Sequence, residues 1–315
     1  MSFAFVFPGQ GSQSVGMLAA LGAAEPAVRS TFAEASQVLG YDLWRLVSEG
    51  PEAALNATER TQPAMLAAGT AVWRAWRARG GTVPSRVSGH SLGEFTALVC
   101  AGALDFPAAI ELVRFRGEAM QEAVAAGSGA MAAILGLDDE AVVALCREAA
   151  GSGVLEAANF NSPGQIVIAG DVAAVQRAIE AAMAGGAKRA VRLPVSVPAH
   201  SSLMRGAGER LRTRLASLPV HRPEIPYVSA VDAREHAAPE DIRELLVRQI
   251  SSPVRWTDTL RALSAGDIAQ VIECGPGKVL TGLNRRIERR PNLAFLALED
   301  PASIETALVA TAGSP

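Results

Sequence analysis

The hydrophobic pattern of the chain alternates between short apolar runs and longer segments with helical spacing. The first run, FAFVF at 3–7, ends at a proline and a glycine, which is typical of a buried strand. Runs of the same kind predict further strands at 86–89, 227–231, 268–273 and 293–298. Apolar residues with a helical period predict helices at about 26–39, 62–79, 106–125, 201–217 and 239–250. Strands that alternate with helices predict an α/β fold, in which helices cover both faces of a largely parallel sheet.

The pattern changes between residues 127 and 196. Here the apolar runs predict strands at 129–137, 154–161, 165–170 and 188–196, and the helical segments lie at 138–150 and 171–184. The resulting order is β-α-β-β-α-β, the split unit of ferredoxin-like folds. We therefore predict an inserted ferredoxin-like subdomain at 127–196, with residues 1–126 and 197–315 forming the α/β core.

Composition and charge exclude several classes of protein. Apolar residues make up 49% of the 315 residues, enough for a sizeable core. The formal net charge of −3 gives no overall positive field to attract nucleic acid or a membrane surface. The three cysteines are far apart, which argues against a disulfide framework or a zinc site. No apolar run reaches the ~18 residues of a membrane span and no signal peptide is visible, so we expect a cytoplasmic protein.

The stretch VSGHSLGEF at 87–95 places Ser91 at the centre of a G-x-S-x-G pattern. A serine on a sharp turn between a strand and a helix exposes its oxygen and offers backbone N–H groups to a developing oxyanion. Ser91 is therefore a candidate nucleophile. An ordinary tight turn is the alternative explanation of the same pattern.

A serine nucleophile needs a base, and histidine is the usual one. We favour His200 because it follows a predicted strand, and sites of open α/β sheets form at the carboxyl ends of strands. Its alternative role is to cap the helix that follows. Asp171 lies between Ser91 and His200 in the chain order of a hydrolase triad, but it is equally well placed as a helix N-cap. Without an acid, a carbonyl oxygen could orient the imidazole.

Helical spacing separates two arginines in the segment 106–125. Arg114 shares a polar face with Glu118, whereas Arg116 falls on the apolar stripe. A buried guanidinium needs an anion. That anion is either an internal carboxylate such as Glu94 or the carboxylate of a substrate, and the second choice would select a dicarboxylic acyl group.

Two glycine-rich loops follow predicted strands. FPGQGSQ at 7–13 lacks the third glycine of a dinucleotide-binding fingerprint, and it suits a second oxyanion donor at or near Gln10. GPGK at 275–278 lacks the frame of a phosphate-binding loop. We therefore expect no nucleotide site at either loop.

Seven segments together make the chain resemble the malonyl-CoA:acyl carrier protein transacylases of fatty acid synthesis. In chain order they are FPGQGSQ, GHSLGE, FRG, NFNSPGQIVIAG, VPAHSSLM, RQISSPVRWT and ECGPGKVL. The resemblance covers nearly the whole chain. It implies an α/β-hydrolase-like core with a ferredoxin-like insertion.

The resemblance also implies a role for each candidate residue. Ser91 would carry the acyl ester, His200 would act as general base and then acid, and Arg116 would bind the malonyl carboxylate. Gln10 and Leu92 would supply the oxyanion N–H groups.

Three further roles follow from the same resemblance. The backbone carbonyl of Gln249 would orient the ring of His200 in place of an acid, which leaves Asp171 without a catalytic role. Asn159 and Asn161 would lie at the cleft between the subdomains.

The implied reaction is a ping-pong transfer from malonyl-CoA to the phosphopantetheine thiol of acyl carrier protein, through a malonyl ester of Ser91. We expect no metal or redox cofactor. The expected partners are acyl carrier protein and malonyl-CoA or coenzyme A, without nucleic acid or a membrane, and the chain is expected to act as a monomer. Three alternatives stay open: a serine thioesterase or esterase, an acyltransferase that serves a polyketide carrier protein, and a non-catalytic docking module.

Overall fold

The structure is a computed structural model that describes residues 2–195 and 197–312. Its strands are β1 Ser2–Phe7, β2 Arg86–Gly89, β3 Gly129–Leu135, β4 Leu155–Ser162, β5 Gln165–Asp171, β6 Arg189–Arg192, β7 Tyr227–Val228, β8 Glu235–His236, β9 Ile268–Cys274 and β10 Ala294–Leu298. Its α-helices are α1 Ala19–Ala24, α2 Pro26–Leu39, α3 Leu43–Glu49, α4 Glu52–Leu55, α5 Thr58–Ala78, α6 Gly93–Cys100, α7 Phe106–Glu122, α8 Asp139–Ala150, α9 Val172–Ala184, α10 Arg205–Ala216, α11 Pro239–Gln249, α12 Trp256–Leu263, α13 Val279–Ile287 and α14 Pro301–Thr311. A short 3₁₀ turn, Ser202–Met204, precedes α10.

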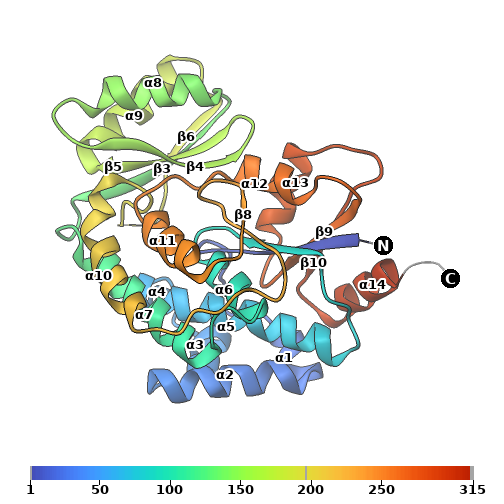
Figure 1. The fold of residues 1–315 in the computed structure, drawn as a ribbon. Helices are drawn as coiled ribbons and strands as arrows, with labels where there is room; N and C mark the ends of the chain where they lie inside the picture. The colour runs from blue at the N-terminus through green and yellow to red at the C-terminus, as the bar shows by residue number, and fades with distance from the viewer. Residues whose placement is uncertain (1, 196, 313–315) are drawn as a thin grey trace.

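The strands form two separate sheets, and the predicted fold class is confirmed (Figure 1). The larger sheet has the order β10-β9-β1-β2-β7-β8, in which all neighbours are parallel except the short β7–β8 pair. The smaller sheet has the order β4-β5-β3-β6 and is antiparallel throughout. This is the strand order of a ferredoxin-like unit.

The central strand β1 is buried on both faces, as expected for a parallel sheet between helices. Phe5 faces α5, and its ring centroid lies 5.4 Å from that of Trp76. Its chain neighbours Ala4 and Val6 face the other side, where they pack in a cluster with Trp256 of α12. The alternation of apolar residues along one strand therefore holds helices on both faces.

The smaller sheet uses its two faces differently. One face packs against α8 and α9, which Figure 1 shows on the side away from the larger sheet. The opposite face carries Met131 and Val167, which pack with the partly buried Ala199. At its edge, β4 pairs with the core, because the Phe160 N–H donates to the Val254 carbonyl at 2.9 Å. This pairing joins the smaller sheet to the segment that leads into α12.

Two predicted strands are shorter in the structure. The run at 227–231 forms only β7, Tyr227–Val228, because a tight turn follows in which the Ser229 N–H donates to the Arg234 carbonyl. The run at 188–196 forms only β6, Arg189–Arg192. Pro194, which has no N–H, follows two residues later, and residue 196 lies outside the described part of the chain.

The helix predicted at 201–217 is confirmed in its C-terminal part, since a 3₁₀ turn comes first and α10 begins at Arg205. The sequence patterns did not predict α1, α3, α4, α12 and α14, most of which are short. None of the helices in the described residues is long and apolar enough to cross a membrane.

Candidate active site

Ser91 lies on a forced turn between β2 and α6. Its backbone has φ +51°, in the left-handed region that favours glycine. The glycines on either side allow this turn, because a Cβ at Gly89 would overlap the backbone of Gly93. A Cβ at Gly93 would in turn overlap the carbonyl oxygen of Phe7 at the end of β1. The G-x-S-x-G pattern is therefore required by close backbone packing, and it places the serine oxygen beyond the carboxyl end of the sheet.

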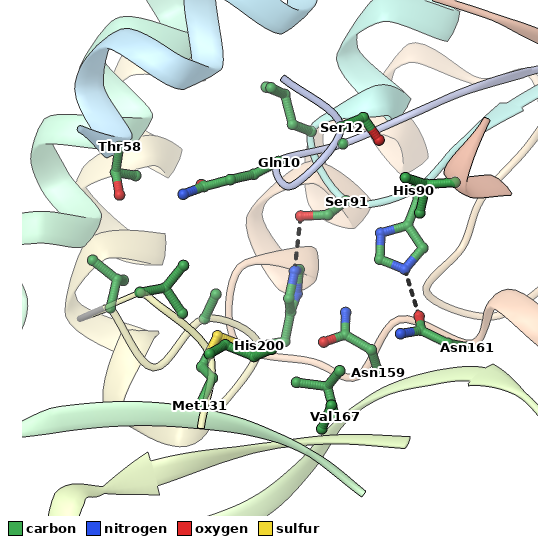
Figure 2. A pocket seen from close by; sticks show the side chains of 18 of the residues that line it. Gln10, Ser12, Thr58, His90, Ser91, Met131, Asn159, Asn161, Val167 and His200 are labelled. Carbon is green, nitrogen blue, oxygen red and sulfur yellow. Dashed lines mark hydrogen bonds between the residues drawn. The ribbon is translucent and has the colours of Figure 1, made fainter. Parts of the chain in front are cut away.

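The structure brings His200 to Ser91, although the two residues are 109 positions apart in the sequence. The His200 Nε2 lies 2.8 Å from the Ser91 Oγ, and Figure 2 shows the imidazole pointing at the serine. The reason given for His200 from sequence was wrong in detail. His200 does not follow a strand directly, because β6 already ends at Arg192. It lies on an irregular turn, where its backbone has φ +64°.

Two carbonyl oxygens set the tautomer of His200. Its Nδ1 lies 2.8 Å from the carbonyl oxygen of Gln249 and 3.2 Å from that of Ser252. Both atoms only accept hydrogen bonds, so Nδ1 carries the proton and Nε2 is free to accept the proton of Ser91. Burial, reinforced by the positive charge of Arg116, lowers the pKa of His200 from 6.5 to about 3. The ring is therefore neutral at physiological pH, which is the form a general base requires.

Asp171 takes no part in this arrangement. It stands at the N-cap position of α9, but its side chain does not cap the helix. The carboxylate instead accepts a hydrogen bond of 2.7 Å from the Val154 N–H within the smaller sheet. The Ser-Asp-His triad considered from chain order is thus not formed.

The backbone around Ser91 offers two N–H groups for an oxyanion. They belong to Leu92, the N-cap residue of α6, and to Gln10 in the loop after β1. Neither N–H group has a hydrogen-bond acceptor among the described residues. The Gln10 loop is held close to the serine turn, since a Cβ at Gly9 would overlap the His90 carbonyl oxygen. Figure 2 shows the Gln10 side chain extending towards Thr58, away from His200. Its backbone N–H is therefore the better placed donor.

Arg116 is buried in α7, with 1% of its surface exposed. Its Nη1 donates to the side-chain oxygen of Gln62 at 2.8 Å, and its Nη2 donates to that of Gln249 at 2.9 Å. Nη2 also lies 3.5 Å from the Ser91 Oγ. Among the described residues, no carboxylate forms an ion pair with Arg116, and its Nε has no hydrogen-bond partner. Burial lowers the pKa of Arg116 to about 10, so the guanidinium keeps its charge at neutral pH.

Glu94, the internal carboxylate considered for Arg116, reaches it only through Gln249. The Gln249 Nε2 donates to the Glu94 Oε2 at 2.8 Å and to the Ser91 carbonyl at 2.9 Å. The other oxygen of Glu94 accepts from the Ala230 N–H and from the Ser229 hydroxyl. Burial raises the pKa of Glu94 from 4.5 to about 7, and these hydrogen bonds oppose the rise.

Sequence reasoning missed Gln62 and the side chain of Gln249. Both are buried glutamines on helices, with 1% of their surface exposed. A glutamine buried on the apolar stripe of a helix signals a polar contact, but the pattern does not say with which partner. Arg114, in contrast, lies where helical spacing predicts it, 3.3 Å from Glu118 on a half-exposed face.

A cavity of about 280 Å³ leads from Ser91 to the cleft between the two sheets. Asn159 and Asn161 line it from β4, together with Met131 and Val167 of the neighbouring strands (Figure 2). The Nε2 of His90 lies 2.8 Å from the Asn161 Oδ1, and burial lowers the pKa of this histidine. A neutral His90 donates here, which leaves the amide N–H₂ of Asn161 for a ligand.

The described residues contain no group of three or more His, Cys, Asp or Glu side chains arranged to hold a metal ion. The three cysteines are buried and free. The chemistry available in the cavity is thus that of an activated serine next to a buried cation.

Comparison with known protein families matches residues 4–290 to the acyl transferase domain. The chain belongs to the acyl transferase family. It is therefore an acyltransferase, in agreement with the Ser91–His200 pair. The malonyl CoA-acyl carrier protein transacylase of Escherichia coli K12 is 52% identical over 306 residues, which cover 97% of this acyltransferase and 98% of that protein. The protein of the same name from Bacillus subtilis is 44% identical over 306 residues, 97% and 96% of the two chains.

Solved structures agree with these relatives. A malonyl-transacylase in complex with a type II PKS acyl-carrier protein, PlMCAT:AntF, has a TM-score of 0.97 and 52% identity, and covers 99% of this acyltransferase and 100% of that chain. The malonyl CoA-acyl carrier protein transacylase of Coxiella burnetii has a TM-score of 0.96 and 47% identity, with 98% and 97% covered. The resemblance inferred from the sequence motifs is confirmed.

Proposed function

We propose that this acyltransferase moves a malonyl group from malonyl-CoA to the phosphopantetheine thiol of an acyl carrier protein, through a malonyl ester of Ser91. The relatives named above support this choice of donor and acceptor. The product is the extender unit of fatty acid synthesis. No metal or redox cofactor is part of the proposed reaction, because nucleophile, base and oxyanion donors all come from the chain.

The observation that carries the proposal is the state of Arg116. Its guanidinium is buried and charged, and its hydrogen bonds go to two neutral amide oxygens rather than to a carboxylate. A buried charge without an anion is costly, and a guanidinium binds a carboxylate with two parallel hydrogen bonds. With Nη2 only 3.5 Å from the Ser91 Oγ, the free carboxylate of a malonyl group supplies the missing anion.

In the first half-reaction, the Ser91 hydroxyl gives its proton to the His200 Nε2 while its oxygen attacks the thioester carbon. The carbonyl oxygen gains negative charge, which the N–H groups of Leu92 and Gln10 stabilise. The carbon–sulfur bond then breaks, His200 returns the proton to the leaving sulfur, and coenzyme A departs. The malonyl group stays on Ser91 as an ester.

In the second half-reaction, the phosphopantetheine thiol of the carrier protein gives its proton to His200, and its sulfur attacks the ester carbon. The carbon–oxygen bond to Ser91 breaks, and the serine oxygen takes the proton back from His200. Coenzyme A and acyl carrier protein present the same phosphopantetheine arm, so one cavity serves both steps.

The setting of the reaction is part of the same proposal. All the groups that it uses lie on one chain, which is consistent with a monomer. The three free, buried cysteines are consistent with the reducing cytoplasm.

Intact mass spectrometry tests the proposal. The protein is mixed with malonyl-CoA, with and without holo acyl carrier protein, in parallel with the Ser91→Ala variant. We expect a malonyl adduct on the wild type that persists in water, moves to the carrier protein when it is added, and is absent from the variant. Release of free malonate with no lasting adduct would instead make water the acceptor and the protein a thioesterase.

The choice of carrier protein is tested in the same samples. Holo carrier proteins of fatty acid synthesis and of a type II polyketide pathway are offered together at equal concentration. We expect the fatty acid carrier to be malonylated faster. Preference for the polyketide carrier would place the enzyme in that pathway.

A further inference from the structure

We propose that Glu94 is a positioning residue for malonyl selection, which acts through the side chain of Gln249 to hold the guanidinium of Arg116 in line with Ser91. This inference rests on the proposed function. It concerns a carboxylate that touches neither the substrate nor the reacting atoms.

The side-chain amide of Gln249 can adopt only one orientation. Its N–H₂ group donates both hydrogens, one to the Ser91 carbonyl at 2.9 Å and one to Glu94 at 2.8 Å. Its oxygen therefore faces the other way and accepts from the Arg116 Nη2 at 2.9 Å. A flipped amide would set two donors against each other at Arg116 and two acceptors against each other at Ser91.

Glu94 fixes this orientation because only an acceptor fits at its position. The Ala230 N–H points at one carboxylate oxygen and the Gln249 N–H at the other. Glu94 has no exposed surface, so water cannot replace either contact. The backbone fixes the position of both side chains: Glu94 stands in the first turn of α6, three residues after Ser91, and Gln249 is the last residue of α11.

The substitution Glu94→Gln turns this geometry into a test. An amide presents one oxygen and one N–H₂ group, whereas both positions around Glu94 need an acceptor. In one orientation the new N–H₂ group faces the Ala230 N–H, and in the other it faces the N–H₂ group of Gln249. If the new N–H₂ faces Gln249, that glutamine must flip to accept, and its own N–H₂ then repels Arg116. The substitution would thus displace the guanidinium without altering Arg116, Ser91 or His200.

The structure contains a matched control in Glu273. It too is a glutamate with no exposed surface, and it accepts hydrogen bonds from two backbone N–H groups, of Leu280 at 3.1 Å and of Thr281 at 2.7 Å. Burial raises its pKa to about 7, as it does for Glu94. Glu273→Gln therefore reproduces the loss of a buried carboxylate without touching the Arg116 network.

The experiment measures the acylation rate constant, as kcat/KM, with malonyl-CoA and with acetyl-CoA. We expect Glu94→Gln to lower the malonyl-to-acetyl ratio by about tenfold or more, the effect of losing one hydrogen bond to a charged group. Glu273→Gln should leave the ratio within about twofold. In an Arg116→Ala background, Glu94→Gln should have no further effect on the ratio, because its route of action is gone.

A folded Glu94→Gln variant that keeps the wild-type ratio, or that slows both substrates equally, would overturn the inference. If this variant does not fold, Glu94→Asp keeps a carboxylate at this position but withdraws it by one methylene from the N–H₂ group of Gln249. That variant should also lower the malonyl-to-acetyl ratio, and a folded Glu94→Asp variant with the wild-type ratio would count against the proposal. Failure of the wild type itself to form a malonyl ester would refute the proposed function instead, whatever the variants do.

Discussion

Arg116→Ala should separate malonyl transfer from the rest of catalysis. A guanidinium has five N–H groups, and in the structure one goes to Gln62 and one to Gln249. The Nε of Arg116 has no described partner, and Nη2 makes only a long contact of 3.5 Å with the Ser91 Oγ. Three N–H groups thus remain, and two of them suffice to hold a carboxylate. At roughly 1.5–2 kcal/mol for each hydrogen bond to a charged group, their loss is worth about 3–4 kcal/mol, or about 10²- to 10³-fold in kcat/KM.

The assay follows formation of the acyl ester on Ser91 by rapid quench and intact mass, with malonyl-CoA and acetyl-CoA. We expect the malonyl rate of Arg116→Ala to fall by the amount above, and the acetyl rate to stay within about threefold, since acetyl has no carboxylate to bind. Arg114→Ala is the matched control, because this arginine lies on the same helix in an exposed pair with Glu118, and such pairs contribute little. Equal losses for both acyl groups would show that Arg116 supports the fold rather than the substrate, and the reasoning would be refuted.

The remaining predictions concern the base and the serine turn. His200→Asn should slow acylation by about 10²- to 10⁴-fold for malonyl and acetyl alike, measured in the same assay, and a loss confined to one acyl group would contradict its role as general base. The pKa of His200 falls from 6.5 to about 3 on folding, so its contribution to stability is complete above pH 6.5 and is lost as the pH falls towards 3. Between pH 7 and pH 5 the wild type should therefore lose roughly 2 kcal/mol more unfolding free energy in urea than His200→Asn does, and parallel curves would argue against a neutral buried ring. Gly93→Ala should prevent folding or lower the melting temperature sharply, because the new methyl overlaps the Phe7 carbonyl, whereas Gly282→Ala, in open space on α13, should be neutral or stabilising. Similar melting temperatures for the two variants would contradict the close packing of the turn.

Hydrophobic spacing predicted the fold where segments are long and regular. The helices α2, α5, α7 and α11 and the strands β1 and β9 appear within a few residues of their predicted bounds. The errors have local causes. The strand expected to continue to residue 196 stops at Arg192, two residues before Pro194, and short helices such as α4, Glu52–Leu55, carry too few turns for a period to be visible.

In the candidate site, too, local sequence patterns point to some residues, whereas others become visible only in the folded structure. Ser91 and Arg116 could be found from local sequence, because a glycine-flanked turn and a charge on an apolar stripe each leave a mark within a few residues. The partners of Arg116 could not, since Gln62 and Gln249 come from helices far away in the chain and only the tertiary fold brings their amides together. His200 does lie in hydrogen-bond contact with Ser91, but the sheet-edge argument for choosing it does not describe the turn on which it lies.

The last residue of α11 couples the two halves of the site. The backbone carbonyl of Gln249 holds the His200 Nδ1 at 2.8 Å, and its side chain holds the Arg116 Nη2 at 2.9 Å and the Ser91 carbonyl at 2.9 Å. A carboxylate at the usual place of a triad acid would sit beside Arg116 and compete with the substrate for its charge. A carbonyl orients the imidazole without adding an anion, so the guanidinium remains available to the acyl group. Among the described residues no acid lies next to His200, and under the proposed function this leaves the buried guanidinium of Arg116 free to bind a dicarboxylic acyl group.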